Sequence, residues 1–384
     1  MVNGMSYQLI VLGAEKPQLM QELVNSVRER LAVIGPEVAA DLVILKAGEL
    51  DRLSPIAPAV AVYFSGDHSS DRAEVEALVE KAVPVLPVVD ALEGYTANTP
   101  DVLHSINAIA VTTETGLPAL ANLVLENLSL LRRSRRLFLS YRRADSTAAA
   151  HQLRVAFDDE GYDPFLDTSS VPKGDDFQAV LMHRLLDSDV MIVLDTKNFL
   201  SSRWTREELA AASAMGVGLL RVVWPGVARV PYAELAEHLY LDPRDFVDEL
   251  LTVKAIARII DAVEALRARC IAARHTNLVV EFCDEAKRIG AVTSIQPGRY
   301  VLAILPDGRR IAAIPAVGVP DANLYHDASG RFPSEGEHAD EAVLVYNDSG
   351  MLDTWKAFLN WLDEHLPVRG LRVTDTVTRL GDGR

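Results

Sequence analysis

Two short segments of the chain carry the side chains that could do chemistry. An apolar run ending at residue 139 leads into Arg142, Arg143 and Asp145, and further along the chain Trp204 is followed four positions later by Glu208. Guanidinium groups bind phosphate oxygens in a bidentate manner. A carboxylate beside a ribose stabilises an oxocarbenium-like transition state. Together these residues predict a substrate that has both phosphate groups and a glycosidic bond.

The spacing of the second segment selects its carboxylate. Residues 205–215 have the pattern of a helix that ends at Gly216. Trp204 and Glu208, at positions i and i+4, then share one helix face. Glu207, at i+3, lies near that face and is the competing candidate.

Each of these residues also has an ordinary structural role open to it. Glu208 alone would suit an exposed carboxylate near the positive N-terminus of a helix. Either arginine could form a surface salt bridge with Asp145 or Asp167. Trp204 could anchor a core without touching a ligand.

The composition is that of an ordinary globular protein. The chain has 384 residues, which allows two or three domains. Its net charge of −16 argues against binding to nucleic acid. Cys270 and Cys283 are the only cysteines, which suits a reducing compartment, and we expect a cytoplasmic protein. We expect no secretory signal at the start of the sequence and no membrane-spanning helix, since no stretch of 18 apolar residues occurs.

Several enzyme classes lose support from missing motifs. The segment around Gly13 lacks the later glycines of a dinucleotide-binding loop, and no Walker A sequence occurs. The nine histidines show no ligand spacing, so no metal site is expected. No G-x-S-x-G elbow appears, so a serine hydrolase is unsupported.

Hydrophobic patterning divides the chain into three regions. Residues 1–130 alternate short apolar runs with helical segments, which predicts an α/β domain with a parallel sheet. Residues 131–136 form a basic run that we interpret as a solvated linker. A second α/β domain is predicted over 137–265. An α+β domain of unassigned role is predicted over 266–384. Helices are expected at 246–269, 277–289 and 354–365, and strands at 299–304, 310–314 and 341–346.

Residues 137–224 resemble a Toll/interleukin-1 receptor (TIR) domain. The resemblance rests on five motifs in the family's order, and it leaves both flanking regions uncovered. The motifs are the first strand with its polar turn at 138–143, the second strand at 161–167, the long loop at 168–177, the strand at 188–194, and the tryptophan-to-glutamate element at 202–209.

The resemblance implies a flavodoxin-like parallel sheet and an activity. Many TIR domains cleave the nicotinamide–ribose bond of NAD⁺ with a glutamate four residues after the tryptophan, which is Glu208 here. Arg142, Arg143, Asp145, Trp204 and Phe165 are then the expected substrate-binding residues. The sheet would bring the arginines and Glu208 to the carboxyl ends of the strands, where open α/β folds bind ligands. NAD⁺ is expected as the substrate, with no separate cofactor.

The resemblance also implies partners and roles. TIR domains of this branch assemble with one another, and we expect the loop containing Pro172, Lys173, Gly174 and Asp175 to mediate self-association. The first domain, TIR-like or receiver-like, and the last would then regulate a bacterial defence or signalling enzyme that responds to an unknown activator. Two alternatives stay open: a non-enzymatic interaction scaffold, and a module that senses a nucleotide without cleaving it.

Overall fold

The computed structural model of the protein describes residues 7–381 except 35–38, 55–56, 67–70, 113–115, 167–175, 198, 200–209, 228–235, 297–298 and 336–338. The chain divides into two compact units. The first comprises residues 1–134 and 253–269, and the second comprises residues 135–252 and 270–384.

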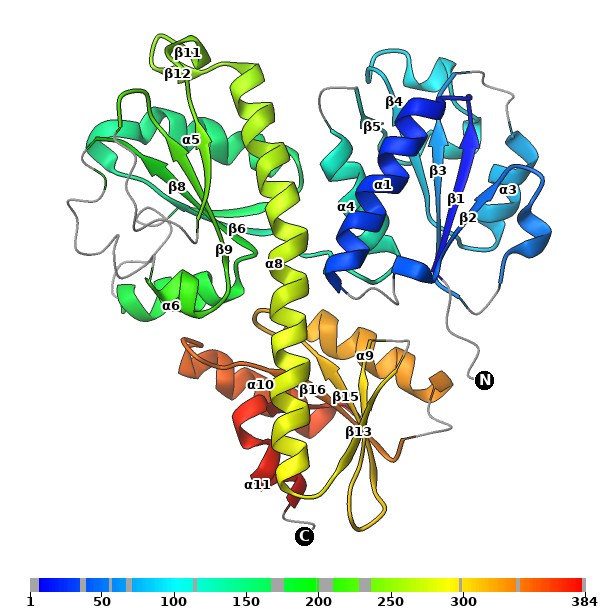
Figure 1. Ribbon diagram of the computed structural model, residues 1–384, viewed down its shortest axis with the longest axis vertical. Helices are drawn as coiled ribbons and strands as arrows, with labels where there is room; N and C mark the ends of the chain where they lie inside the picture. Colours follow the sequence, from blue (N-terminus) through cyan, green and yellow to red (C-terminus); the bar gives the residue numbers. More distant parts are fainter. Residues whose placement is uncertain are drawn as a thin grey trace. The chain divides into compact units, whose positions relative to one another are not determined.

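The first unit is built on a parallel sheet of order β2-β1-β3-β4-β5, drawn in blue to cyan in Figure 1. Its central strand β3 reads AVAVYF and is buried along almost its whole length, as expected for a parallel strand covered on both faces. The strands are β1 (Tyr7–Gly13), β2 (Leu42–Lys46), β3 (Ala59–Phe64), β4 (Val85–Val89) and β5 (Ile109–Ala110). The helices are α1 (Pro17–Ile34), α3 (Arg72–Glu80) and α4 (Leu117–Asn127). The predicted α/β domain is confirmed.

The second unit begins with another parallel sheet, of order β10-β9-β8-β6-β7. Numbered within this domain, the order is 2-1-3-4-5, the flavodoxin-like order that was predicted. The strands are β6 (Arg136–Ser140), β7 (Asp163–Leu166), β8 (Val190–Asp195), β9 (Gly218–Val223) and β10 (Glu237–Tyr240). The helices are α5 (Arg143–Asp159), α6 (Phe177–Asp187) and the described part of a further helix at 210–214.

The basic run at 131–136 is not a fully solvated linker. Leu131 and Arg135 are buried, and Arg136 is the first residue of β6. The Arg136 guanidinium forms an ion pair with the buried carboxylate of Asp187 at the end of α6. The chain enters the second sheet at Arg136, one residue earlier than predicted. The end of the basic run therefore belongs to the folded domain.

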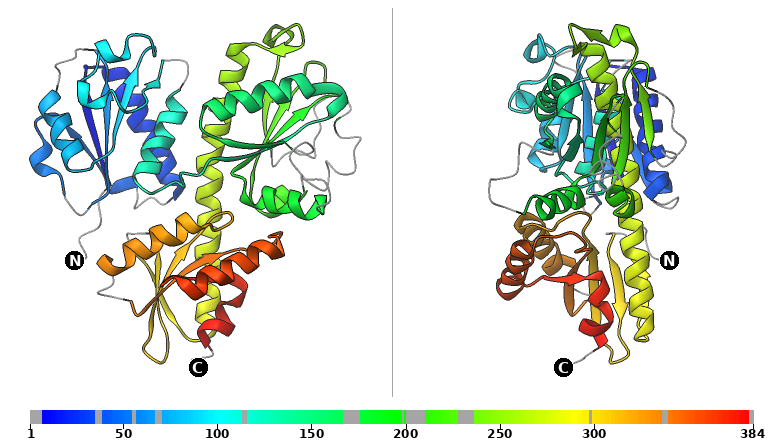
Figure 2. Two further views of the ribbon diagram at one scale, coloured as in Figure 1. Left: turned by 180° about the vertical axis from the view of Figure 1, so that it is seen from behind. Right: turned by 90° about the vertical axis from the view of Figure 1, so that its left-hand side faces the viewer.

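One long helix replaces the two helices predicted over 246–289. The helix α8 (Val253–Arg288) has 36 residues, which corresponds to about 54 Å, and Figure 2 shows it as unbroken. Residues 270–276 contain neither glycine nor proline, so nothing in the sequence ends the helix there. The predicted boundary between residues 265 and 266 therefore falls inside a helix. Before α8, the strands β11 (Phe246–Val247) and β12 (Leu250–Leu251) form a hairpin whose turn residues have positive φ.

The remainder of the second unit is a mixed sheet with helices on both faces. Its order is β13-β14-β15-β16-β17, antiparallel from β13 to β15 and parallel from β15 to β17. Val343 and Val345 pack toward α8 and α11, while Ala342 and Leu344 pack toward α9 and α10. The elements are β13 (Val292–Ile295), β14 (Val301–Ile304), β15 (Arg310–Pro315), α9 (Ala322–Glu335), β16 (Glu341–Tyr346), α10 (Asp353–His365), β17 (Arg369–Arg372) and α11 (Thr376–Gly381). The predicted α+β region is confirmed.

Polar contacts join the two sheets of the second unit. The Asp187 carboxylate accepts a hydrogen bond from the main-chain N–H of Val319, at 3.1 Å. The buried Arg274 of α8 donates to the carbonyl oxygens of Ser188, at 2.8 Å, and Leu186, at 2.6 Å. These contacts satisfy the carbonyls at the C-terminal end of α6, which would otherwise be unpaired.

A buried polar network completes the first unit around the first part of α8. Arg267, with a fully buried side chain, pairs with Glu126 of α4 at 2.5 Å. It also donates to the carbonyl oxygen of Arg132 at 2.6 Å. One turn away, the side chain of Asn122 donates to the carboxylate and the carbonyl of Glu264.

Candidate active site

The carboxyl ends of β6 and β8 meet at a cluster of polar side chains. The Asp145 carboxylate accepts two hydrogen bonds on the same oxygen, one from Arg142 Nη1 and one from Thr196 Oγ1, each at 3.0 Å. Arg142 follows β6 and Thr196 follows β8. Asp145 thus bridges the ends of two neighbouring strands, at the edge where open parallel sheets bind ligands.

The start of α5 fixes the positions of the two arginines. Arg142 is the N-cap residue of α5, with extended backbone, and Arg143 is the first helical residue and is exposed. Ser146 departs from helical geometry, with φ of −147°, and its hydroxyl donates to the carbonyl oxygen of Arg142 at 3.3 Å. This bend in the first turn lets Asp145 point back toward Arg142 and across to Thr196.

A second polar network lies in the core next to this cluster. The carboxylate of Asp195, the last residue of β8, pairs with Arg221 of β9, and both side chains are almost completely buried. Arg221 Nη1 also lies 3.0 Å from His238 Nε2 on β10. Burial, reinforced by the nearby Arg221 charge, lowers the pKa of His238 and favours its neutral ring.

The structure describes only part of the predicted site. Arg142 and Asp145 lie together, and Arg143 is on the same turn. Trp204, Glu207 and Glu208 lie outside the described residues, as do Pro172, Lys173, Gly174 and Asp175 of the loop expected to mediate assembly.

One predicted substrate contact is a core residue instead. Phe165 is 7% exposed and packs against Phe138, with ring centroids 5.4 Å apart. The Arg184 guanidinium of α6 covers its ring at 5.6 Å. Phe165 therefore fills the space between β7 and α6, and we leave it out of the candidate site.

Sequence reasoning did not find Thr196, Asp195, Arg221 or His238. The only available signal was that an acidic residue and a threonine directly follow a run of five apolar residues, at 190–194. That pattern marks the ligand-binding end of a strand, but it does not reveal which side chain on another strand is the partner.

The cluster has the groups to hold an anion. Arg142, Arg143 and the exposed Lys197 supply cationic groups at the sheet edge. Guanidinium and ammonium groups in this setting suit the oxygens of a pyrophosphate. Across the described residues, no group of three or more His, Cys, Asp or Glu side chains is arranged to hold a metal ion. Nor does any described helix have the length and hydropathy to span a membrane.

Comparisons with known proteins support the fold assignment. The family model for the TIR domain matches residues 137–253. No curated protein matches the sequence. Among solved structures, the TIR domains of the activated Roq1 resistosome, which recognizes the pathogen effector XopQ, are 21% identical, with 36% of this chain and 84% of that chain covered and a TM-score of 0.24.

The C-terminal domain of glucosamine-fructose-6-phosphate aminotransferase from Francisella tularensis is 11% identical, with 70% of this chain and 85% of that chain covered and a TM-score of 0.21. At these TM-scores neither structure bears on function. The family match coincides with the flavodoxin-like sheet of the second unit and with the five motifs in the sequence. Residues 137–253 of this chain therefore form a TIR domain.

Proposed function

We propose that the TIR domain cleaves the bond between nicotinamide and ribose in NAD⁺. The observation that supports this most is the cationic cluster at the carboxyl ends of β6 and β8, where Arg142 is oriented by Asp145 at 3.0 Å. NAD⁺ carries a pyrophosphate that suits this cluster. The TIR family includes enzymes that use this substrate, and Glu208 stands at the family's catalytic position in the sequence.

The proposed reaction requires few catalytic groups from the protein. When the N-glycosidic bond breaks, its electron pair moves to the nicotinamide nitrogen, and nicotinamide departs as a neutral molecule. Positive charge then develops on the ribose, and the Glu208 carboxylate stabilises it. Water adds to the ribose carbon and loses a proton to give ADP-ribose. If the adenine of the same molecule adds instead, the product is cyclic. Arg142 and Arg143 hold the pyrophosphate during both steps.

The test is incubation of the full-length protein with NAD⁺, with chromatographic detection of nicotinamide and of linear and cyclic ADP-ribose. We expect Glu208→Gln to lower the rate by about 10²- to 10³-fold, since it removes one electrostatic contact in the transition state. Glu207→Gln is the matched control because it makes the same change on the adjacent residue, and we expect it to keep activity within a few-fold. Equal losses in both variants would show that the wrong carboxylate, or the wrong reaction, has been chosen.

A non-enzymatic interaction scaffold is the second candidate function. It is favoured by the Arg142–Asp145 ion pair, because the charge of Arg142 already has a partner within the domain. The two functions differ in the effect of Arg143→Gln, which changes an exposed residue at the start of α5. An NAD⁺-cleaving enzyme should show a raised KM with a smaller change in kcat. A scaffold should show no NAD⁺ turnover at any protein concentration.

The activity is proposed to depend on self-association through the loop at 168–177. Head-to-tail contacts between identical domains are heterologous and tend to give open filaments. Alanine substitution of both Lys173 and Asp175 should reduce assembly, measured by light scattering, and NAD⁺ turnover together. If neither changes, the loop has no role in assembly. We further propose that the protein acts in bacterial defence or signalling in the cytoplasm, and that the regions flanking the TIR domain regulate it.

A further inference from the structure

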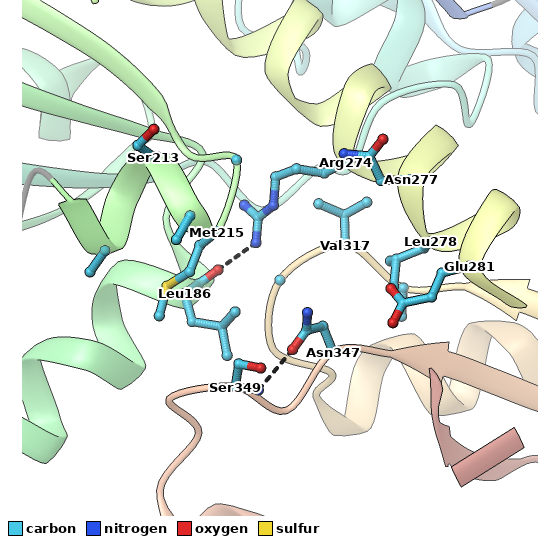
Figure 3. A pocket seen from close by; sticks show the side chains of 15 residues that line it. Leu186, Ser213, Met215, Arg274, Asn277, Leu278, Glu281, Val317, Asn347 and Ser349 are labelled. Atoms are coloured by element: carbon cyan, nitrogen blue, oxygen red, sulfur yellow. Dashed lines mark hydrogen bonds between the residues drawn. The ribbon is translucent and has the colours of Figure 1, made fainter. Parts of the chain in front are cut away.

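A cavity of about 440 Å³ lies within the second unit, between the TIR domain and the mixed sheet that follows it. Its walls come from three parts of the chain. The TIR domain contributes Leu186, Ala211 and residues 213–216. The helix α8 contributes Arg274, Asn277, Leu278 and Glu281. The mixed sheet contributes residues 316–318, Asn347 and Ser349. Figure 3 shows the lining side chains around this space. The volume is within the range of small-molecule sites and accommodates a nucleoside-sized compound.

The two loops lie at the ligand-binding end of the mixed sheet. Residues 316–318 directly follow β15, and residues 347–349 directly follow β16. These strands are parallel neighbours, so their carboxyl ends share one edge. Open α/β sheets bind ligands in the crevice outside this edge. The cavity therefore occupies the usual ligand position of a domain whose role the sequence left unassigned.

The lining combines an apolar floor with a polar rim. Leu186 and Leu278 are buried and Met215 is half-buried, which gives a surface that suits a flat ring. Asn277 and Glu281 come from α8, as Figure 3 shows, and both are exposed. Asn347 Oδ1 accepts a hydrogen bond from the Ser349 N–H at 2.8 Å, so its amide hydrogens are the groups best placed to donate to a ligand.

The charges of the lining disfavour phosphate. Among the described residues that line the cavity, Arg274 is the only one with a cationic side chain. Two of its nitrogens donate to the carbonyl oxygens of Leu186 and Ser188, so these donors are already occupied by the cavity wall. The carboxylate of Glu281 would repel an anion and attract N–H donors.

We propose that this cavity binds an uncharged heteroaromatic compound of nucleoside size, with N–H donors for Glu281 and an acceptor for the amide of Asn347. The bound compound would contact residues 211–216, which directly follow the segment that contains Glu208 in the sequence. Occupancy would therefore hold the end of that TIR helix against the loops of the mixed sheet. Neither this proposal nor its test depends on NAD⁺ cleavage.

The test uses adenosine, guanosine and cytidine as probes of the full-length protein, with binding measured by calorimetry and by saturation-transfer NMR. At least one nucleoside should bind, and AMP should bind about tenfold more weakly than adenosine, because its phosphate meets Glu281. Hydrogen exchange should slow at residues 211–216 and 347–349 when the probe is present. Failure of all three nucleosides to bind would overturn the proposal, as would tighter binding of AMP.

Substitutions in the cavity and in the candidate active site show where the nucleoside binds. Ala214→Trp and Ser349→Trp fill the cavity from opposite sides, from two exposed positions, and each should weaken binding by tenfold or more. Glu281→Gln keeps the shape and removes the charge, and should weaken binding by about tenfold to a hundredfold. Arg143→Gln changes the candidate active site instead and should leave nucleoside binding unchanged. Binding that survives both tryptophan variants, or is lost only in Arg143→Gln, would place the nucleoside elsewhere and refute the proposal.

Discussion

Replacing Arg267 with Met should destabilise the first unit selectively. The Arg267 side chain has no exposed surface, pairs with Glu126 at 2.5 Å and donates to the Arg132 carbonyl at 2.6 Å. Methionine keeps most of the side-chain volume but leaves the buried Glu126 carboxylate without this partner. Removing one member of a buried ion pair typically costs about 3–5 kcal/mol. That is a large part of the roughly 5–15 kcal/mol that stabilises a domain.

The tryptophans allow the two units to be followed separately. All four lie in the second unit, at positions 204, 224, 355 and 361. Urea unfolding followed by tryptophan fluorescence therefore reports the second unit, and far-UV circular dichroism reports both. The free energy of unfolding falls with urea by about 2 kcal/mol per molar. A loss of about 3–5 kcal/mol therefore predicts that the urea midpoint of the first unit falls by about 1.5–2.5 M. The fluorescence midpoint should stay close to that of the wild type.

Two further variants test whether the loss of stability comes from breaking the ion pair or from any substitution in this helix. Arg269→Met, two residues further along α8 and exposed, should change stability by less than about 0.5 kcal/mol. Glu126→Leu combined with Arg267→Met should recover most of the loss, because replacing both partners by apolar groups leaves no buried charge. The reasoning fails if Arg267→Met shifts neither midpoint, or if it shifts fluorescence and circular dichroism by the same amount.

Three other outcomes follow from the described residues. Gly13→Ala should cost the first unit at least about 2 kcal/mol, because φ is +89° and a Cβ would lie 2.2 Å from a carbonyl oxygen of β3; Gly48→Ala, with φ of +78° and open space around it, should cost only about 1 kcal/mol in the same urea titration. Burial, reinforced by the nearby Arg299 charge, lowers the pKa of His275 to about 3, so below about pH 6.5 the unfolded chain takes up a proton that the folded protein does not. The free energy of unfolding of the second unit should therefore fall by about 1 kcal/mol by about pH 5. We expect only this partial effect because His275 is half-buried. His275→Gln should remove the fall when unfolding is followed by fluorescence. Asp195→Asn should destabilise the second unit by about 3–5 kcal/mol, since it neutralises the partner of a buried arginine, and an unchanged fluorescence midpoint would contradict this.

The sequence predicted the strands of both parallel sheets better than it predicted the long helix. Buried runs such as residues 190–194 are bounded by polar residues or glycine, and their alternation with helical segments leaves few possible topologies. The prediction of two helices was wrong because residues 270–276, which contain no glycine or proline, continue the helix α8. A helix can pack against different elements along its length without a break in the helix itself.

The candidate site was only partly predictable for a related reason. Arg142 and Asp145 are close in sequence, so their pairing follows from one helical turn. The contact between Asp145 and Thr196 depends on β6 and β8 being neighbours, which is a property of the whole sheet. Phe165 was expected at the substrate, but the alternation of side chains along β7 turns it toward α6.

The division of the first unit into two distant chain segments has a consequence for its synthesis on the ribosome. Residues 1–134 emerge first, but the segment at 253–269 that completes the unit follows only after the whole of residues 135–252 has been made. At about 5–20 residues per second, that delay is roughly 10 s. Until then Glu126 lacks the arginine that neutralises it, and the surface of α4 that α8 will cover stays open to water. Residues 135–252 of the second unit are therefore synthesised before the helical segment that completes the first unit becomes available.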